Sequence, residues 1–120
     1  MVHIIVITKY RKNIFTKEDI SNSVKHSFCT TAKKYGYSIL QIETDKDHVH
    51  LLVEYRPNIS VSIIARQLKQ HSTYYMWKHY SEILSKHYWE RSVLWSDGFF
   101  ACSIGQVSKE TIEKYIQSQG

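Results

Sequence analysis

The chain has 120 residues, which is enough for one domain with a hydrophobic core of its own. Hydrophobic residues make up 42% of it, and no apolar run approaches the length of a membrane span. Its two cysteines, Cys29 and Cys102, form no Cys-x-x-Cys pair, which excludes a cysteine-type zinc site and fits a reducing cytoplasm. The formal net charge of +5 favours an anionic partner such as nucleic acid, although solubility alone is an equally good explanation.

The N-terminal third of the chain predicts a strand followed by a helix. Residues 2–8 form a continuous run rich in β-branched side chains, which is typical of a buried strand. A basic loop is expected at 9–13. Over 19–34 apolar residues recur at helical spacing, and Gly36 is placed to end that helix. The positions expected on its buried face are Ile20, Val24, Phe28 and Ala32.

The middle of the chain predicts a β-hairpin and a long helix. Residues 37–44 and 48–55 form two expected strands around a turn at 45–47. The side chains expected to face inward from the first of these strands are Ile39, Leu40 and Ile42. Ser60 is placed to cap a helix that runs to about residue 80. The expected apolar face of this helix consists of Ile63, Ile64, Leu68 and Tyr75.

The C-terminal third predicts a strand and a final helix after an irregular, aromatic stretch at 81–96. The strand is expected at 99–104, and Ser108 is placed to cap a helix over 109–118. The order β-α-β-β-α-β plus a terminal helix matches the ferredoxin-like, split β-α-β plan. We therefore expect a single α+β domain spanning residues 1–120, with an antiparallel sheet that carries two helices on one face and leaves the other face open.

The segment DHVHLLVEY, residues 47–55, contains a candidate metal site. Because side chains alternate on a strand, His48 and His50 share one face, while the apolar residues between them share the other. Two imidazoles two residues apart on one strand face lie close enough to bind one metal ion. A pair of surface histidines would give the same pattern, so this motif alone is a weak signal.

The terminal helix carries a candidate nucleophile. Tyr115 and Gln119 are four residues apart and share one helix face, next to an apolar stripe of Ile112 and Ile116 that would dock the helix. An activated tyrosine can attack covalently, and a glutamine carbonyl can complete a metal-ligand set. A tyrosine packed at a helix–sheet seam is the alternative.

Four motifs in chain order give the sequence a resemblance to a known family. They are KYRKNIF at 9–15, DHVHLLV at 47–53, LWSDGFFACSIG at 94–105 and YIQSQ at 115–119. Together they resemble the HUH single-tyrosine transposases of small insertion sequences that move as single-stranded DNA. The resemblance covers nearly the whole chain. One departure is Gln70 after Leu68-Lys69, where the family often has glycine.

The resemblance implies a specific chemistry. Tyr115 would attack a DNA phosphodiester and leave a 5′-phosphotyrosine, with His48, His50 and Gln119 holding a divalent ion, Mg²⁺ or Mn²⁺. It also implies recognition of a DNA hairpin near the element ends, and a homodimer in which the tyrosine helix of one subunit serves the histidines of the other. The expected location is the prokaryotic cytoplasm, at the nucleoid and not at a membrane.

Basic and aromatic side chains outside these motifs are candidates for DNA binding. The expected phosphate contacts, each with an ordinary solvated charge as its alternative, are Lys9, Arg11, Lys12, Lys33 and Lys34. Aromatic residues between 74 and 100 can stack on bases, but core or dimer-interface packing is favoured for most of them. The remaining histidines are interpreted as surface or packing residues, and they are His3, His26, His71, His79 and His87.

Two other functions compete with the transposase. A relaxase or replication-initiator nuclease uses the same HUH chemistry, but such proteins are usually larger than 120 residues. A non-catalytic nucleic-acid binder is also possible, because a ferredoxin-like sheet with exposed aromatics is the RNA-recognition plan. The sequence lacks the aromatic-glycine pattern of such RNA-binding domains. This alternative also gives Tyr115 and the histidine pair no role.

Overall fold

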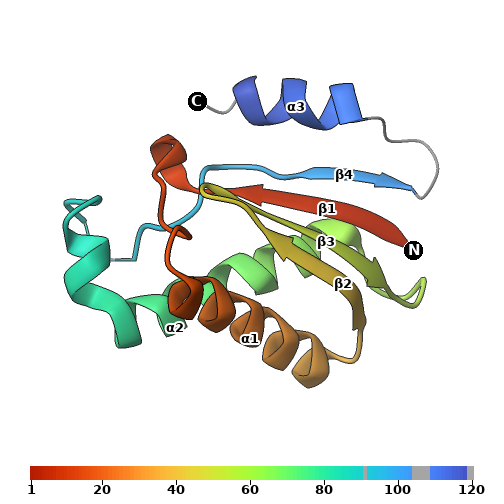
Figure 1. The fold of residues 1–120 in the computed structure, drawn as a ribbon. Coiled ribbons are helices and arrows are strands. Elements are labelled where there is room, and N and C mark those ends of the chain that lie inside the picture. The colour runs from red at the N-terminus through yellow and green to blue at the C-terminus, as the bar shows by residue number, and fades with distance from the viewer. Residues whose placement is uncertain (91, 104–108, 119–120) are drawn as a thin grey trace.

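The computed structural model describes residues 1–90, 92–103 and 109–118. A four-stranded antiparallel sheet carries two long helices on one face and a third helix over the other (Figure 1). The strands are β1 (Val2–Ile7), β2 (Ser38–Thr44), β3 (His48–Glu54) and β4 (Phe100–Ser103). The helices are α1 (Glu18–Tyr35), α2 (Val61–Ser85) and α3 (Lys109–Ser118), with a 3-10 helix at Lys9–Arg11 in the expected basic loop. Within the described ranges, none of the helices combines the length and apolar character needed to cross a bilayer.

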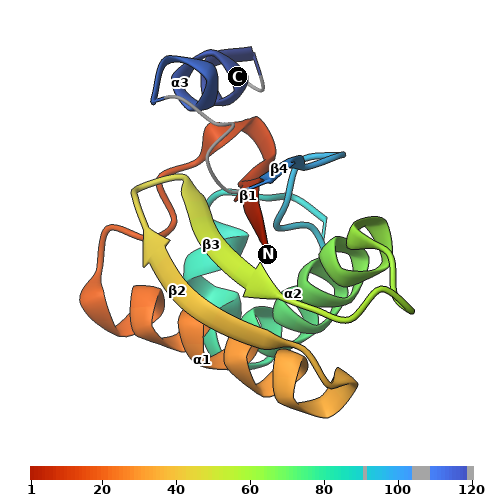
Figure 2. The same cartoon turned by 90° about the vertical axis from the view of Figure 1, so that its right-hand side faces the viewer.

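The strand order across the sheet is β2-β3-β1-β4, and each neighbouring pair is antiparallel. This is the ferredoxin-like arrangement, so the predicted α+β fold class is confirmed. Figure 2 shows that α3 lies on the opposite side of the sheet from α1 and α2. The face that the sequence left open is therefore covered in part by the terminal helix.

Helix α1 packs on the sheet through the predicted stripe. Its buried apolar residues are Ile20, Val24, Phe28 and Ala32. Full burial of a side chain such as Phe28 contributes roughly 1.5–3 kcal/mol relative to exposure. The helix ends as predicted at Gly36, which adopts a left-handed conformation with φ +86° and donates its N–H to the Ala32 carbonyl at 2.9 Å.

Helix α2 begins at the predicted cap, where Ser60 Oγ accepts a hydrogen bond from the Ile63 N–H at 3.2 Å. It continues to Ser85, beyond the predicted end near residue 80, although the backbone is non-helical at Tyr80 (φ −133°). One turn past this kink Leu84 is fully buried, and its burial favours the extension. The prediction that Ile63 faces the core is wrong, because its side chain is exposed. The buried stripe of α2 consists of Ile64, Leu68, Ser72 and Met76.

The strands send alternate side chains to the two faces of the sheet. Those that pack beneath α1 and α2 are Val2, Ile4 and Val6 of β1 and Val49, Leu51 and Val53 of β3. Ile39 and Ile42 of β2 pack against this core, as predicted. Leu40 is exposed instead, because the β2–β3 pairing shifts its register between Ile39 and Gln41.

The segment between α2 and β4 is irregular, as predicted, and aromatic side chains anchor it. The buried Trp95 donates its indole N–H to Ser72 Oγ of α2 at 2.9 Å. The buried Tyr88 donates its hydroxyl to the carbonyl groups of Lys9 and Leu94 at 3.0 and 3.1 Å. The Tyr88 bonds tie the basic Lys9–Arg11 turn to the chain that leads into β4, and the Trp95 bond ties that chain to α2.

Candidate functional site

The sheet face beneath α3, here called the α3 face, gathers the residues that carry the candidate chemistry. Strand pairing places His48 beside Ile7, His50 beside Ile5, and Ile5 beside Phe100. Paired residues project to the same side, so the predicted histidine pair lies on the α3 face and not against the core. The prediction that His48 and His50 share a face away from the core is confirmed.

His48 is held by a carboxylate. Its Nδ1 lies 2.9 Å from Asp47 Oδ1, and Asp47 Oδ2 lies 3.2 Å from Arg11 Nε. Burial alone would raise the pKa of Asp47, but the hydrogen bonds from His48 and Arg11 outweigh it and keep that pKa below its usual value. A carboxylate that accepts from Nδ1–H leaves Nε2 of His48 with a free lone pair, which is the usual arrangement for a metal-binding histidine.

His50 faces another histidine that sequence reasoning assigned to the surface or to packing. Its Nε2 lies 3.1 Å from Nδ1 of His3 on β1, with the ring centroids 5.2 Å apart. Burial lowers the pKa of His50, the charges of His3 and His48 act in the same direction, and Glu43 opposes them. His50 is therefore a neutral imidazole near pH 7, the form that binds metals.

Tyr115 lies over the same face but not beside the histidines. Its half-buried ring is 5.3 Å from the ring of Phe100, centroid to centroid. Phe100 pairs with Ile5 and Ile5 with His50, which separates Phe100 from His50 by two interstrand spacings, or roughly 10 Å. Burial raises the pKa of the Tyr115 phenol. The predicted ligand Gln119 and the predicted helix cap Ser108 lie outside the described residues.

His48 and His50 would supply two ligands of a metal ion, and the other ligands would have to come from outside the described residues. Within those residues, no group of three or more His, Cys, Asp or Glu side chains is placed to bind a metal. His48 and His50 supply two imidazoles, and the Asp47 contact gives the first of them its preferred orientation. An amide oxygen, water or phosphate oxygen would have to complete such a site.

The predicted DNA-contacting residues fall into two separate places. Arg11 is joined to Asp47, and Lys9 and Lys12 flank it at the end of the sheet that holds His48. Lys33 and Lys34 are exposed on the last turn of α1, in the helical layer opposite α3 (Figure 1). The structure therefore joins Arg11 to the histidine site through Asp47, places Lys9 and Lys12 in the same turn, and leaves Lys33 and Lys34 remote from the site.

The turn that holds Arg11 is strained. Tyr10 and Arg11 have φ values of +60° and +52°, a region that costs non-glycine residues of order 1–3 kcal/mol. The Arg11 N–H donates to the Thr8 carbonyl at 2.9 Å, and the Arg11 side chain binds Asp47, so local contacts hold the conformation. It leaves the Tyr10 ring 66% exposed, with Lys9 Nζ 5.5 Å from its centroid. The turn thus presents an aromatic ring and a cation together to solvent.

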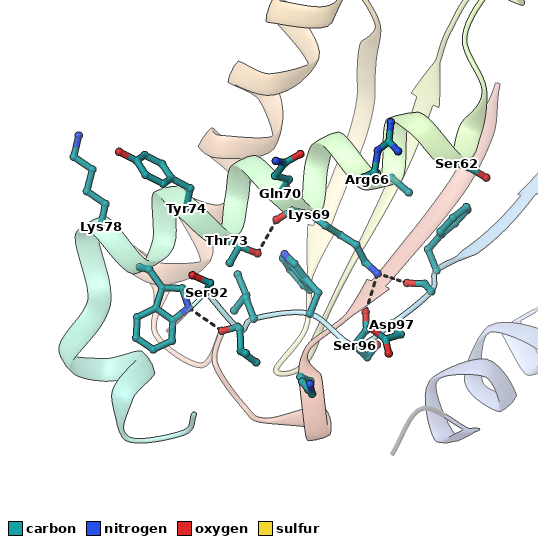
Figure 3. A pocket seen from close by; sticks show the side chains of 18 residues that line it. Ser62, Arg66, Lys69, Gln70, Thr73, Tyr74, Lys78, Ser92, Ser96 and Asp97 are labelled. Carbon is teal, nitrogen blue, oxygen red and sulfur yellow. Dashed lines mark hydrogen bonds between the residues drawn. The ribbon is translucent and has the colours of Figure 1, made fainter. Parts of the chain in front are cut away.

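A groove of about 1210 Å³ runs between α2 and residues 92–99 (Figure 3). Among the described residues, its charged side chains are Lys9, Arg66, Lys69 and Lys78 against Asp97, so the lining is cationic. Lys69 donates to the Ser96 and Gly98 carbonyl groups, and burial lowers its pKa, with Asp97 acting in the opposite direction. Lys69 thus ties the loop to the helix.

One rim of this groove is an exposed row on α2, here called the α2 ridge. It consists of Ser62, Arg66, Gln70, Tyr74 and Lys78. These residues are spaced by four and lie on the helix face opposite the buried stripe, since an offset of two residues is about 200° of rotation. In Figure 3 Arg66, Tyr74 and Lys78 project outward from α2. Sequence reasoning missed the ridge, because a polar row on an amphipathic helix normally marks only solvent exposure.

Comparisons with known proteins identify the family of this chain. The model of the family "Transposase IS200 like" matches residues 1–119. The ISDra2 transposase TnpA of Deinococcus radiodurans is 27% identical over 117 residues, covering 98% of this chain and 81% of that protein. The transposase for insertion sequence element IS200 of Salmonella typhimurium is 27% identical over 119 residues, covering 98% of this chain and 74% of that protein.

Two solved structures share the fold. A crystal structure from Deinococcus radiodurans, described as that of a transposase, superposes with a TM-score of 0.88 at 23% identity and covers 98% of this chain and 88% of that one. A REP-associated tyrosine transposase bound to a REP hairpin gives a TM-score of 0.58 at 12% identity, covering 96% of this chain and 61% of that one. With the family model matched along nearly its whole length, the chain belongs to the IS200-like transposase family.

Proposed function

We propose that this protein cuts and rejoins single-stranded DNA at the ends of an insertion sequence through a covalent 5′-phosphotyrosine on Tyr115. The observation that carries the proposal is the shared location of the histidine pair and Tyr115: β3 presents His48 and His50 on the sheet face over which α3 holds Tyr115. Membership in the IS200-like transposase family supports DNA cleavage and strand transfer as the reaction class. An architecture that only bound nucleic acid would have no need for these three side chains on one face.

The proposed step is an exchange of phosphoesters. The phenol oxygen of Tyr115 attacks the scissile phosphorus, a new P–O bond to the tyrosine forms, and the P–O3′ bond breaks. The phenol loses its proton, and the departing 3′-oxygen gains one to become a free hydroxyl. In the rejoining step a 3′-hydroxyl attacks the phosphotyrosine and releases Tyr115. The bond energy stays in the ester, so no nucleotide cofactor is required.

The proposed metal site uses His48, His50 and Gln119. Asp47 keeps His48 oriented, and burial keeps His50 neutral, so both imidazoles are available as ligands. A bound Mg²⁺ or Mn²⁺ would supply positive charge against the scissile phosphate. Imidazole ligands favour Mn²⁺ over Mg²⁺.

The proposed assembly is a homodimer in which Tyr115 acts in trans. In a single chain the Tyr115 ring contacts Phe100 of the edge strand β4, and roughly 10 Å of sheet separate that contact from His50. The tyrosine must therefore change position to attack a phosphate held at the histidines. Exchange of α3 between two subunits is one such change, and the family resemblance favours it.

The proposed substrate is single-stranded DNA with a hairpin. Four cations against one carboxylate line the α2 groove, which suits a phosphate backbone. Tyr74 on the α2 ridge is 72% exposed, which suits stacking on a base. A hairpin is the ligand of the REP-associated tyrosine transposase that shares the fold, and this likeness supports a hairpin here.

Covalent capture tests the proposal directly. The protein is incubated with Mn²⁺ and a library of single-stranded oligonucleotides that carry hairpins, denatured, and the strands that remain attached are sequenced. We expect adducts with defined 5′ ends for the wild type, none for Tyr115→Phe, and none on fully paired duplexes. Adducts that survive in Tyr115→Phe would refute the nucleophile assignment.

The same reaction distinguishes the transposase from its two competing functions. A relaxase or replication-initiator nuclease would nick the strand and form the adduct, but would not join the cleaved ends of two element termini. A non-catalytic binder would retain DNA without any covalent adduct. Transposase activity therefore requires both the adduct and a joined product, detected by amplification across the new junction.

A further inference from the structure

A second hollow, here called the turn pocket, lies between the basic turn at residues 9–12 and the segment after α2, residues 87–90 and Val93. Its volume is about 420 Å³, which is within the range of pockets that hold small organic groups. The buried Tyr88 lines it and donates its hydroxyl to the Lys9 carbonyl at 3.0 Å. The two walls of the pocket are therefore held together by the fold.

Two exposed aromatic side chains line the turn pocket, one on each wall. Tyr10 is 66% exposed and Trp89 is completely exposed, so both rings are open to solvent. Tyr10 has a left-handed backbone with φ +60°, a conformation that is unfavourable for a side chain of this size. A ring kept at the surface contributes little to stability, because the hydrophobic effect favours only apolar area that leaves water. The two rings are therefore better explained by a ligand than by the stability of the fold.

The charges around the two rings favour an anionic ligand with flat, aromatic parts. Lys9 and Lys12 line the pocket, and Glu90 is the one carboxylate among its described lining residues. Lys9 Nζ lies 5.5 Å from the centroid of the Tyr10 ring. Aromatic rings beside cations are the combination that binds single-stranded nucleic acid, because the rings stack on bases and the cations contact phosphates.

The turn pocket adjoins both parts of the proposed DNA site. Lys9 and Val93 also line the α2 groove, so the two hollows share a boundary. The turn that forms one wall also holds Arg11, whose Nε is 3.2 Å from Asp47 Oδ2, and Asp47 in turn contacts His48. A DNA strand that leaves the α2 groove at Lys9 would therefore pass the turn pocket on its way to the histidines.

We propose that the turn pocket binds one unpaired DNA base between Tyr10 and Trp89, an inference that rests on the single-stranded DNA substrate of the proposed function. Lys9 and Lys12 contact the adjoining phosphates. The base has to be unpaired, because in a duplex the neighbouring base pairs cover both of its faces. Stacking uses the face of a base and not its edge, so the pocket accepts each of the four bases. It therefore selects an open strand and not a sequence.

Two matched probes separate base stacking from phosphate binding. The first is an oligothymidylate of about 12 nucleotides, and the second is a sugar-phosphate chain of the same length that carries no bases. Fluorescence anisotropy of the labelled probes gives the affinity of the full-length protein for each. EDTA is present throughout, so that cleavage does not contribute to the signal. Both probes carry the same phosphates, so a loss confined to the first probe reports contacts with bases.

The variants remove or keep one ring at a time. Trp89→Ala removes an exposed ring, and Tyr10→Asn removes the other with a residue that tolerates the left-handed backbone at this position. Trp89→Phe and Tyr10→Phe each keep an aromatic ring. Tyr35→Ala is the matched control, because Tyr35 is also exposed beside a lysine, with Lys34 Nζ 5.4 Å from its ring, but lies at the end of α1.

Trp89→Ala and Tyr10→Asn should each weaken binding of the oligothymidylate at least about fivefold, the smallest loss usual for one stacked base. Binding of the probe without bases should stay unchanged in both variants. The two phenylalanine variants and Tyr35→Ala should bind both probes like the wild type. Equal losses for the two probes would overturn base stacking, because a role in phosphate binding or in folding affects both probes alike.

Two further results separate this inference from the proposed function. A wild type that binds neither probe would overturn the single-stranded substrate and the turn pocket together. A wild type that binds the oligothymidylate, with unchanged affinity in Trp89→Ala and Tyr10→Asn, would overturn the turn pocket alone. The covalent adduct on Tyr115 is measured separately and does not depend on either result.

Discussion

Asp47 joins the strained basic turn to strand β3, because its two carboxylate oxygens accept hydrogen bonds from His48 Nδ1 at 2.9 Å and from Arg11 Nε at 3.2 Å. Two segments that lie far apart in sequence thereby fix the orientation of one imidazole. The sequence places Asp47 in the turn before β3 and at the start of the DHVHLLV motif, but it assigns no role to the carboxylate.

Asp47→Ala should lower the rate of cleavage by about 10- to 100-fold, the loss usual for a carboxylate that supports a metal-binding histidine. The variant should still bind hairpin DNA, because the α2 groove is unchanged. Single-turnover cleavage and a DNA-binding titration measure the two effects. Asp45→Ala is the control, since the carboxylate of Asp45 is exposed and caps only the backbone N–H of Lys46. Equal losses in the two variants would contradict this role of Asp47.

His48→Ala and His50→Ala should each abolish cleavage without unfolding the protein, because both rings face away from the core beneath α1 and α2. Chelation of divalent ions with EDTA should have the same effect on the wild type. Cleavage is measured on a hairpin oligonucleotide, and folding by circular dichroism. His71→Ala is the control, since His71 bonds to Tyr35 on the helical layer. Activity that persists in either variant would exclude the proposed site.

The rate of the tyrosine step should rise with pH. Burial raises the pKa of the Tyr115 phenol, so the attacking phenolate is a small fraction near pH 7. Below that pKa the fraction grows about tenfold per pH unit, and the cleavage rate should increase in the same direction until another step limits it. Single-turnover rates between pH 6 and 9 measure the effect. DNA binding by Tyr115→Phe over the same range is the control, and a flat rate profile would contradict deprotonation before attack.

Mixed dimers should reveal whether Tyr115 acts in trans. Tyr115→Phe and the double variant His48→Ala, His50→Ala should each be inactive alone, because each lacks one half of the site. After subunit exchange, a trans dimer contains one complete site, and cleavage should return. A cis arrangement leaves each site defective and gives no product. Subunit exchange is checked with fluorescently labelled chains. An exchanged mixture that gives no cleavage product would therefore exclude the trans arrangement.

The α2 ridge should contribute to DNA affinity but not to the chemical step. Arg66→Ala with Lys78→Ala removes two cations of the groove, and each lost phosphate contact should reduce the slope of log affinity against log salt by about 0.7 to 0.9. The cleavage rate at saturating protein should stay unchanged. Lys33→Ala with Lys34→Ala is the matched comparison, since those lysines lie away from the groove. A larger loss of DNA affinity in the Lys33 and Lys34 variant would indicate that the DNA binds along α1 and not along the α2 ridge.

The sequence by itself determined the periodic parts of this protein. Alternation placed His48 and His50 on one face of β3, and helical spacing identified the buried stripe of α1. Both patterns are local, because the geometry of a strand or helix fixes the direction of each side chain relative to its neighbours. Helical spacing put Tyr115 and Gln119 on one face of the terminal helix, and the family resemblance favoured nucleophile and ligand roles for them over simple packing.

Only the tertiary structure decided which residues from distant parts of the chain lie beside His48 and His50. His3 lies in a strand of almost continuous apolar residues, and the register of β1 against β3 alone brings it to His50. Asp47 and Arg11 meet because a strained turn returns to the hairpin, and Leu40 turns outward because the β2–β3 pairing shifts there. Strand register, positive φ values and bulges depend on contacts between segments far apart in the chain, so sequence periodicity carries no signal for them.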